Sequence, residues 1–133
     1  MADADLNRSD FEKPVSISFL LLDNFTMISL ACAVEPLRMA NQLSVRSLFE
    51  WKLISETGNP ICASDGIRVH VDTSILENQN FDVLFVAGGI DVAESFSKET
   101  LGQLKRLEKK GVQLGGICTG TFVLAAAGLL NGY

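Results

Sequence analysis

The stretch VQLGGICTGTFVLAAAGLL, residues 112–130, decides how this chain folds. Val112 to Ile117 predict a strand, and Thr119 to Ala127 predict a helix that Gly128 closes. Between them, Gly116-Ile117-Cys118-Thr119-Gly120 has the spacing G-x-nucleophile-x-G, with cysteine at the place where α/β hydrolases carry serine. The sequence therefore predicts a nucleophile elbow, a tight turn between strand and helix with Cys118 at its apex.

The spacing of the two glycines has a steric reason. A residue at such an apex adopts a strained backbone conformation, and residues without a Cβ on either side let the strand and the helix approach closely. The free N–H groups and the dipole at the start of the helix favour the thiolate form of Cys118. The alternative is that the glycines are ordinary turn residues and Cys118 is a small buried hydrophobic residue.

Alternating strands and helices surround this turn. The predicted strands are Val15 to Leu22, Phe49 to Ser55, a half-exposed edge strand over Ile67 to Val71 after an Asp65-Gly66 turn, and Phe81 to Ala87. The predicted helices run from Met27 to about Leu43, where Pro36 is expected to kink or restart the helix, and from a Ser97 cap to Gly111.

This order predicts an α/β fold with a doubly wound, mostly parallel, flavodoxin-like sheet and helices on both faces. Ligands of such sheets bind at the carboxyl ends of the strands. Those ends are Asp23-Asn24, Gly88-Gly89 and Cys118. We therefore expect any functional site to lie there.

The composition indicates one domain with a real core. The chain has 133 residues, 47% hydrophobic, and a net charge of −5. Residues 1–13 form a polar tail without the apolar segment of a signal peptide, and residues 14–133 form the domain. No apolar run approaches the roughly 18 residues of a membrane helix, so we expect a cytoplasmic protein without a membrane partner. The basic cluster Lys105, Arg106, Lys109 and Lys110 is interpreted as a solvated helix face, not a nucleic-acid site.

Metal ions and common cofactors are not expected. Three cysteines, Cys32, Cys62 and Cys118, at wide spacings and a single histidine support neither a zinc site nor a disulfide framework. Thr121-Phe122 stands where a phosphate-binding loop needs Lys-Ser/Thr, and no G-x-G-x-x-G follows the first strand. ATP and dinucleotides are therefore not expected as ligands.

A catalytic Cys118 needs an acid or base beside it. His70 lies on the polar side of the predicted edge strand and is interpreted as a surface residue. Asp23, after the first strand, and Glu35, on the first helix, are better interpreted as a cap or surface carboxylates than as catalytic acids. Gly88-Gly89 and the Thr119 N–H offer donors for an oxyanion.

Residues 15–133 resemble the ThiJ/PfpI superfamily of class I glutamine-amidotransferase-like domains, through Ala87-Gly88-Gly89 and the elbow. Within it, the chain is most similar to the N-terminal domains of AraC-type transcriptional regulators. That likeness is carried by Asp23-Asn24-Phe25-Thr26, Glu35 to Asn41 (EPLRMAN), Ala63-Ser64-Asp65-Gly66 and Ala127 to Tyr133 (AGLLNGY). Glu35 to Leu43 look most like regulators of glycine betaine and carnitine catabolism.

The resemblance implies a sensor more than an enzyme. Enzymatic members carry a glutamate that hydrogen-bonds the elbow cysteine, and Ser29 stands at that position here. The histidine that the family tends to place after the elbow helix is not visible either. In such regulators a C-terminal pair of helix-turn-helix units, absent from this chain, binds DNA, and the domain forms a dimer. Since the chain ends at Tyr133, soon after the last helix, we expect it to be truncated at its C-terminal side.

Three hypotheses follow. The favoured one is an effector-binding domain, not an enzyme, whose pocket is lined by Gly88, Gly89, Ile90, Cys118 and Thr119 near Asp23 and Phe25. Its N–H groups would hold the carboxylate of a betaine, carnitine or amino acid, with cation–π contact from Phe25, Phe122 or Trp51 if these are not core residues. The alternatives are a cysteine-dependent hydrolase, glyoxalase or deglycase with Cys118 as nucleophile, and a dimerisation domain with a vestigial pocket.

Overall fold

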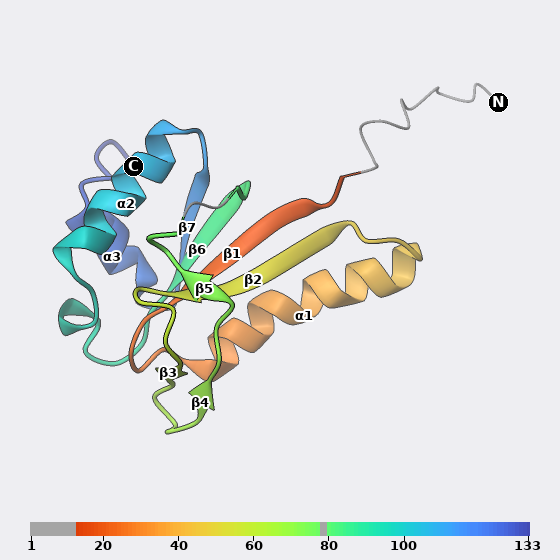
Figure 1. Ribbon diagram of the computed structural model, residues 1–133, viewed down its shortest axis with the longest axis horizontal. Helices are drawn as coiled ribbons and strands as arrows, with labels where there is room; N and C mark the ends of the chain where they lie inside the picture. The colour runs from red at the N-terminus through yellow and green to blue at the C-terminus, as the bar shows by residue number, and fades with distance from the viewer. Residues whose placement is uncertain (1–12, 78–79) are drawn as a thin grey trace.

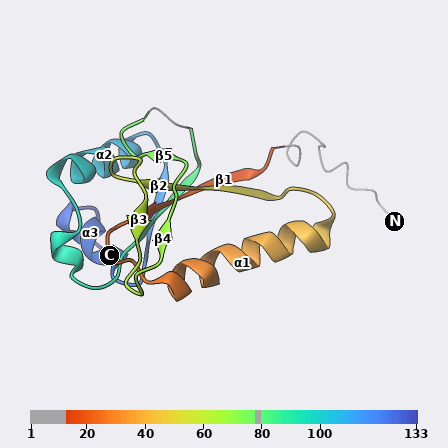
Figure 2. The same cartoon turned by 60° about the horizontal axis from the view of Figure 1, so that its bottom comes forward.

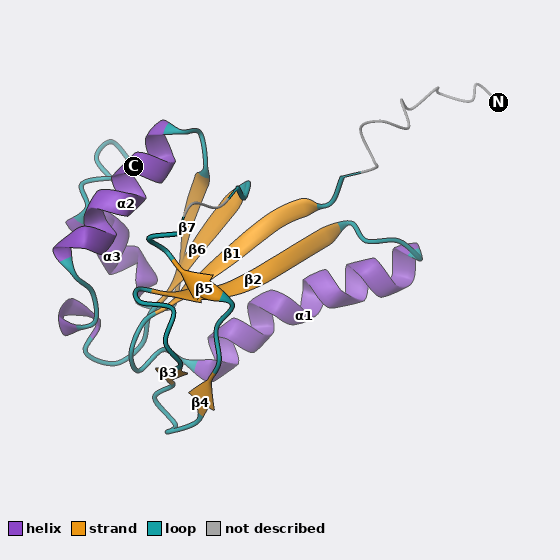
Figure 3. Ribbon diagram, viewed as in Figure 1, coloured by secondary structure: helices purple, strands orange, loops and turns teal. Residues whose placement is uncertain are grey.

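Five parallel strands lie at the centre of the computed structural model, which describes residues 13–77 and 80–133 (Figure 1). In spatial order they are β5 (Thr73–Ser74), β2 (Phe49–Ser55), β1 (Val15–Leu21), β6 (Val83–Ala87) and β7 (Gln113–Ile117). Figure 3 shows these strands side by side, with helices around them. The predicted α/β class and parallel sheet are confirmed.

Helices cover both faces of the sheet. They are α1 (Met27–Ser44), α2 (Lys98–Lys109) and α3 (Gly120–Ala126), with a short 3₁₀ turn η2 (Val92–Glu94). α1 runs along one face, and α2 and α3 lie on the other (Figures 1 and 2). This is the two-sided arrangement that the alternating order predicts.

The side chains of β1 alternate between two cores. Ile17, Phe19 and Leu21 pack with Leu30 on the α1 side. Leu20 and Leu22 are buried on the other side, in a cluster with residues of α2 and α3, namely Leu104, Val123 and Leu124. Because successive side chains of a strand point to opposite faces, an apolar run of this kind is what a strand covered on both sides requires.

α1 is one continuous helix of 18 residues that contains Pro36. The predicted alternative of a restart at Pro36 is wrong, and the alternative of a kink there stays a prediction. A proline removes only one backbone donor of the helix. Val34 and Leu37, which lie on either side of Pro36 in the sequence, pack against the core on this face of the sheet, and these contacts hold the helix together. The far end of α1 is fixed by Asn41, whose side chain accepts from the N–H groups of Leu48 and Phe49 and donates to the Phe49 carbonyl.

The prediction of an edge strand over Ile67 to Val71 is also wrong. Only β4 (Arg68–Val69) is extended there, and it pairs antiparallel with β3 (Ile61–Cys62) in a ribbon separate from the main sheet. The predicted Asp65-Gly66 turn is present and explains this. Gly66 has φ +86°, and the Asp65 carboxylate accepts from the Ile67 N–H at 2.9 Å, so the chain folds back on itself locally. One edge of the main sheet is β5, which pairs with β2, and the other is β7.

The approach to the last strand follows the sequence signals. The Ser97 hydroxyl accepts from the Thr100 N–H at 3.2 Å at the start of α2, and Gly111 takes φ +89° after its end. Within residues 13–77 and 80–133, none of the helices combines the length and hydrophobicity needed to span a membrane. The predicted polar tail lies, except for Lys13, outside the described residues, so its boundary stays a prediction.

Candidate functional site at the elbow

Cys118 occupies a strained turn between β7 and α3. It is not glycine, yet its φ is +55°, a left-handed conformation that most residues avoid. Its side chain is exposed. The predicted apex geometry of the elbow is therefore confirmed, and the alternative of a buried structural cysteine does not fit.

The glycines that flank Cys118 are required by close packing. A Cβ at Gly116 would lie 2.5 Å from the backbone nitrogen of Thr121, and a Cβ at Gly120 would collide with the carbonyl oxygen of Val86. Backbone atoms cannot yield as the end of a flexible side chain can. The strand and the helix therefore meet at the distance that only glycine permits, which is the reason we gave for the spacing.

A second turn, Gly88-Gly89, lies against the elbow. The Thr119 hydroxyl donates to the Gly89 carbonyl at 2.7 Å, and the Gly88 N–H donates to the Ile117 carbonyl at 3.3 Å. A Cβ at Gly89 would collide with the carbonyl oxygen of Asn24, the residue after Asp23. Three predicted strand ends, from β1, β6 and β7, are thus brought together.

The backbone donors at this junction differ in availability. The Gly88 N–H is used within the sheet, so it is not the free donor that we expected. The N–H groups of Gly89 and Thr119 make no hydrogen bond to any acceptor in the described part of the chain. Gly89 is buried, and buried N–H groups are rarely left without an acceptor. Among the described residues, this junction therefore has two backbone donors without an acceptor.

Thr26 supplies the side chain that meets the elbow cysteine. Its hydroxyl lies 3.6 Å from the Cys118 thiol, and its N–H donates to the Gly88 carbonyl at 3.1 Å. The sequence analysis did not name Thr26 as a site residue, although its position just before the first turn of α1 could have indicated that it lies near the strand ends. The resemblance implied that Ser29, one turn along, replaces the glutamate of enzymatic members, and no described carboxylate hydrogen-bonds Cys118.

The other predicted site residues divide into two groups. Asp23 and Ile90 are exposed near the junction, and Ile90 is 60% exposed. The Asp23 carbonyl accepts from the Ser95 hydroxyl, whereas its carboxylate has no hydrogen bond among the described residues. Phe25 is fully buried, so its ring does not provide the expected ligand contact. The ring belongs to the core on the α1 side.

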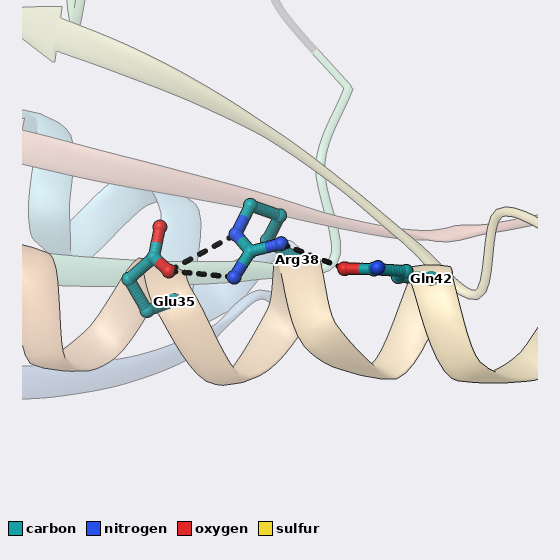
Figure 4. A network of polar contacts seen from close by, with 3 residues as sticks. All are labelled: Glu35, Arg38 and Gln42. Atoms are coloured by element: carbon teal, nitrogen blue, oxygen red, sulfur yellow. Dashed lines mark hydrogen bonds and ion pairs between the residues drawn. The ribbon is translucent and has the colours of Figure 1, made fainter.

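The remaining candidates behave as surface or core groups. His70 is exposed next to β4, and Glu35 pairs with Arg38 on α1 (Figure 4). Neither side chain hydrogen-bonds Cys118. Trp51 packs in the α1-side core, whereas Phe122 is 50% exposed and packs beside Phe96. Within the described ranges, no three His, Cys, Asp or Glu side chains are grouped so as to hold a metal ion.

A parallel α/β domain with a cysteine at a nucleophile elbow is the class that this geometry defines. The chain belongs to the DJ-1/PfpI family, which it matches over residues 15–133. The resemblance seen in the sequence is therefore confirmed.

Its relatives include transcriptional regulators. The chain is 48% identical over 120 residues to the HTH-type transcriptional regulator GbdR of Pseudomonas aeruginosa (strain UCBPP-PA14), covering 90% of this chain and 33% of GbdR. It is 40% identical over 114 residues to the HTH-type transcriptional regulator CdhR of P. aeruginosa PAO1, covering 86% of this chain and 34% of CdhR. The chain thus spans about a third of the length of these relatives.

A solved structure shows the same fold. A crystal structure of an AraC family transcriptional regulator from Pseudomonas putida superposes with a TM-score of 0.80 at 29% identity, covering 90% of this chain and 64% of that one. In both sequence and fold, the chain is thus similar to a part of transcriptional regulators.

Proposed function

We propose that this chain is the effector-sensing domain of an AraC-type transcriptional regulator and binds a small carboxylate at the elbow. One observation carries the proposal. The elbow keeps its strained turn and two unpaired N–H groups, while the side chain that meets Cys118 is a hydroxyl and not an acid. Such a junction suits an anion, and no carboxylate or imidazole in the described part of the chain hydrogen-bonds Cys118 to transfer a proton.

The relatives support the regulatory half of the proposal. GbdR and CdhR are HTH-type transcriptional regulators, and both extend well beyond the part that this chain matches. A net charge of −5 does not suit contact with DNA phosphates by this domain. In the proposed protein a helix-turn-helix unit elsewhere contacts DNA, and the elbow domain receives the effector.

The proposed effector has a carboxylate and a cationic or ammonium group. The N–H groups of Gly89 and Thr119 hold the carboxylate, and Ile90 lies on the exposed rim next to Gly89. Phe122, one turn along α3 from Thr119, keeps half of its surface exposed, so it is the aromatic candidate for cation–π contact. Glycine betaine, carnitine and amino acids share this chemistry.

Calorimetric titration tests the proposal. The chain is titrated with glycine betaine, with carnitine and with glycine, and the proposal expects a saturable heat from at least one of them. Acetate and tetramethylammonium are the matched controls, since each carries one of the two charges. Absence of heat from every betaine, carnitine and amino acid would count against the proposal.

A cysteine-dependent hydrolase, glyoxalase or deglycase is the second candidate. The observation in its favour is that Cys118 is exposed at a strained apex, as a nucleophile must be. Alkylation of Cys118 measured over a pH series separates the two functions. An enzyme requires a thiol that reacts faster than a free cysteine at neutral pH, and our proposal expects no such acceleration and no turnover of glyoxals.

A further inference from the structure

A turn after α3 carries the dipeptide Asn131-Gly132, the one place in the chain where glycine follows asparagine. Residues 131–133 are exposed, and a hydrogen bond from the Tyr133 N–H to the Leu130 carbonyl at 3.1 Å closes the turn. Gly132 has φ +89°, a left-handed conformation that glycine adopts readily in turns. Because a single exposed hydrogen bond contributes little to stability, this turn opens at a low cost in free energy.

The side chain of Asn131 and the backbone nitrogen of Gly132 have no hydrogen-bond partner within the described ranges. A Cβ built on Gly132 would meet nothing within 4 Å, so the space around this residue is open. Asn131 Nδ2 would lie 3.9 Å from a Cβ built on Gly128, which is an ordinary van der Waals distance and does not fix the amide. The amide and the nitrogen that follows it can therefore move against each other.

The other asparagines of the described residues lack this combination. The Asn41 amide is held by three hydrogen bonds to the backbone. Asn59 precedes a proline, whose nitrogen carries no hydrogen. Asn24 and Asn80 each precede a phenylalanine, whose side chain hinders the approach of its own nitrogen. Asn131 is thus the asparagine with an unrestrained amide next to an uncrowded nitrogen.

We propose that Asn131-Gly132 is a site of uncatalysed covalent modification, at which the Gly132 nitrogen attacks the Asn131 side chain and displaces ammonia. The nitrogen gives its proton to hydroxide and forms a bond to Asn131 Cγ, and the bond from Cγ to Nδ2 breaks. The departing nitrogen takes up a proton from water and leaves as ammonia. The product is a five-membered cyclic imide, and its formation does not depend on the proposed effector site.

Water then opens the imide at either of its two carbonyl carbons. Cleavage between the Gly132 nitrogen and Cγ gives an aspartate. Cleavage between the same nitrogen and the backbone carbonyl carbon gives an isoaspartate, in which the main chain runs through the former side chain. Water is the sole co-reactant, and nothing is oxidised or reduced. Either product adds a carboxylate to residues 111–133, which contain no Asp, Glu, Lys, Arg or His.

Peptide mapping by mass spectrometry tests the site in the chain incubated at neutral and at mildly alkaline pH. The peptide with Asn131 is expected to gain about 1 Da roughly tenfold faster than the peptides with the other asparagines. The gain is expected to be faster in alkali, because the attacking nitrogen must lose its proton.

The products distinguish the proposed route from direct hydrolysis of the side chain. The imide gives both aspartate and isoaspartate, which electron-transfer fragmentation tells apart. Aspartate alone would mean that water attacks the side chain directly, and it would overturn the proposal. A peptide with Asn131 that gains no mass, or gains it no faster than the peptides with the other asparagines, would overturn it as well.

Two variants test the roles of the two residues, with circular dichroism to show that each is folded. Asn131→Gln would require a six-membered ring and is expected to abolish the gain in mass over the same time. Gly132→Ala adds a methyl group in open space beside the attacking nitrogen and is expected to slow the gain about tenfold. Gly66→Ala is the matched control, since Gly66 also has a positive φ and nothing within 4 Å of an added Cβ, and the gain at Asn131 should keep its wild-type rate. A wild-type rate in Gly132→Ala would overturn the proposal.

Discussion

The elbow turn and the first turn of α1 meet at Cys118, and they differ in what they contribute. The elbow has a demanding backbone, with a left-handed Cys118 and glycines at 116 and 120 that tolerate no Cβ. The start of α1 contributes the Thr26 hydroxyl, and no described carboxylate hydrogen-bonds Cys118 from there. The contrast is between a backbone with two N–H groups that lack an acceptor and a helix start from which no described carboxylate reaches Cys118.

The largest effect on stability is expected at the elbow. Gly120→Ala forces a Cβ against the Val86 carbonyl, which we expect to cost about 3 kcal/mol or more of the free energy of unfolding. Gly102→Ala is the matched control on α2, where nothing lies within 4 Å of the added Cβ, and it is expected to stabilise by about 0.5–1 kcal/mol. Urea denaturation measures both. A Gly120→Ala variant as stable as the wild type would show that the elbow is not tightly packed.

The next effect concerns how α1 is held in place beside the elbow. Asn41→Leu removes three hydrogen bonds to Leu48 and Phe49 and leaves two half-buried backbone donors without their partner, so we expect the free energy of unfolding to fall by about 1–3 kcal/mol. Gln42→Ala, next in the chain, loses only a bond on the exposed surface and should change stability by less than about 0.5 kcal/mol. Equal effects in thermal denaturation of the two variants would contradict this anchoring role.

A smaller effect, on the reactivity of Cys118, is expected from the neighbouring Thr26 hydroxyl. Thr26→Val removes the group 3.6 Å from the thiol, and the loss of one hydrogen bond of about 1 kcal/mol corresponds to an approximately fivefold slower alkylation of Cys118 at neutral pH. Thr26→Ser keeps the hydroxyl and is expected to react like the wild type. If Thr26→Val alkylates at the wild-type rate, the contact has no influence on the thiol.

The smallest effect lies on the exposed side of α1. Because the Arg38 hydrogen bond lowers the pKa of Glu35, the charged carboxylate stabilises the folded chain above the ordinary pKa of glutamate, and this stabilisation is lost as the pH falls through the lowered value. Glu35→Gln should lower the Tm slightly near neutral pH, and the difference should disappear in acid once the Glu35 carboxylate is protonated. A difference that grows in acid would have the wrong sign.

Local sequence signals predicted the elbow and most of the fold. Apolar runs, the Ser97 cap and glycine spacing act within a few residues, so they are visible in the chain itself. The strand prediction failed because it depended on the choice of pairing partner. Ile67 to Val71 alternate as a sheet strand does, but β4 pairs with the neighbouring β3 and not with the main sheet, and the sequence could not show which partner would be used.

The candidate site was predicted in its backbone and less well in its side chains. Gly88, Gly89, Cys118 and Thr119 come together because parallel strands end at the same edge of the sheet. The Phe25 side chain is buried, whereas the neighbouring Thr26 contacts Cys118, which is 92 residues away in the sequence. Which of two neighbours faces a distant turn depends on helix placement, which a single sequence does not specify.

Titration of glycine betaine into two variants of Cys118 tests the central claim most directly. Asparagine and aspartate both tolerate the left-handed backbone at this position, so Cys118→Asn and Cys118→Asp should fold alike. The account predicts that Cys118→Asn binds glycine betaine with a Kd within a few-fold of that of the wild type. It predicts no binding by Cys118→Asp, because the new carboxylate occupies the N–H groups of Gly89 and Thr119 and repels other anions. Binding of glycine betaine by Cys118→Asp as tight as that of the wild type would contradict the claim that the elbow is an effector carboxylate site.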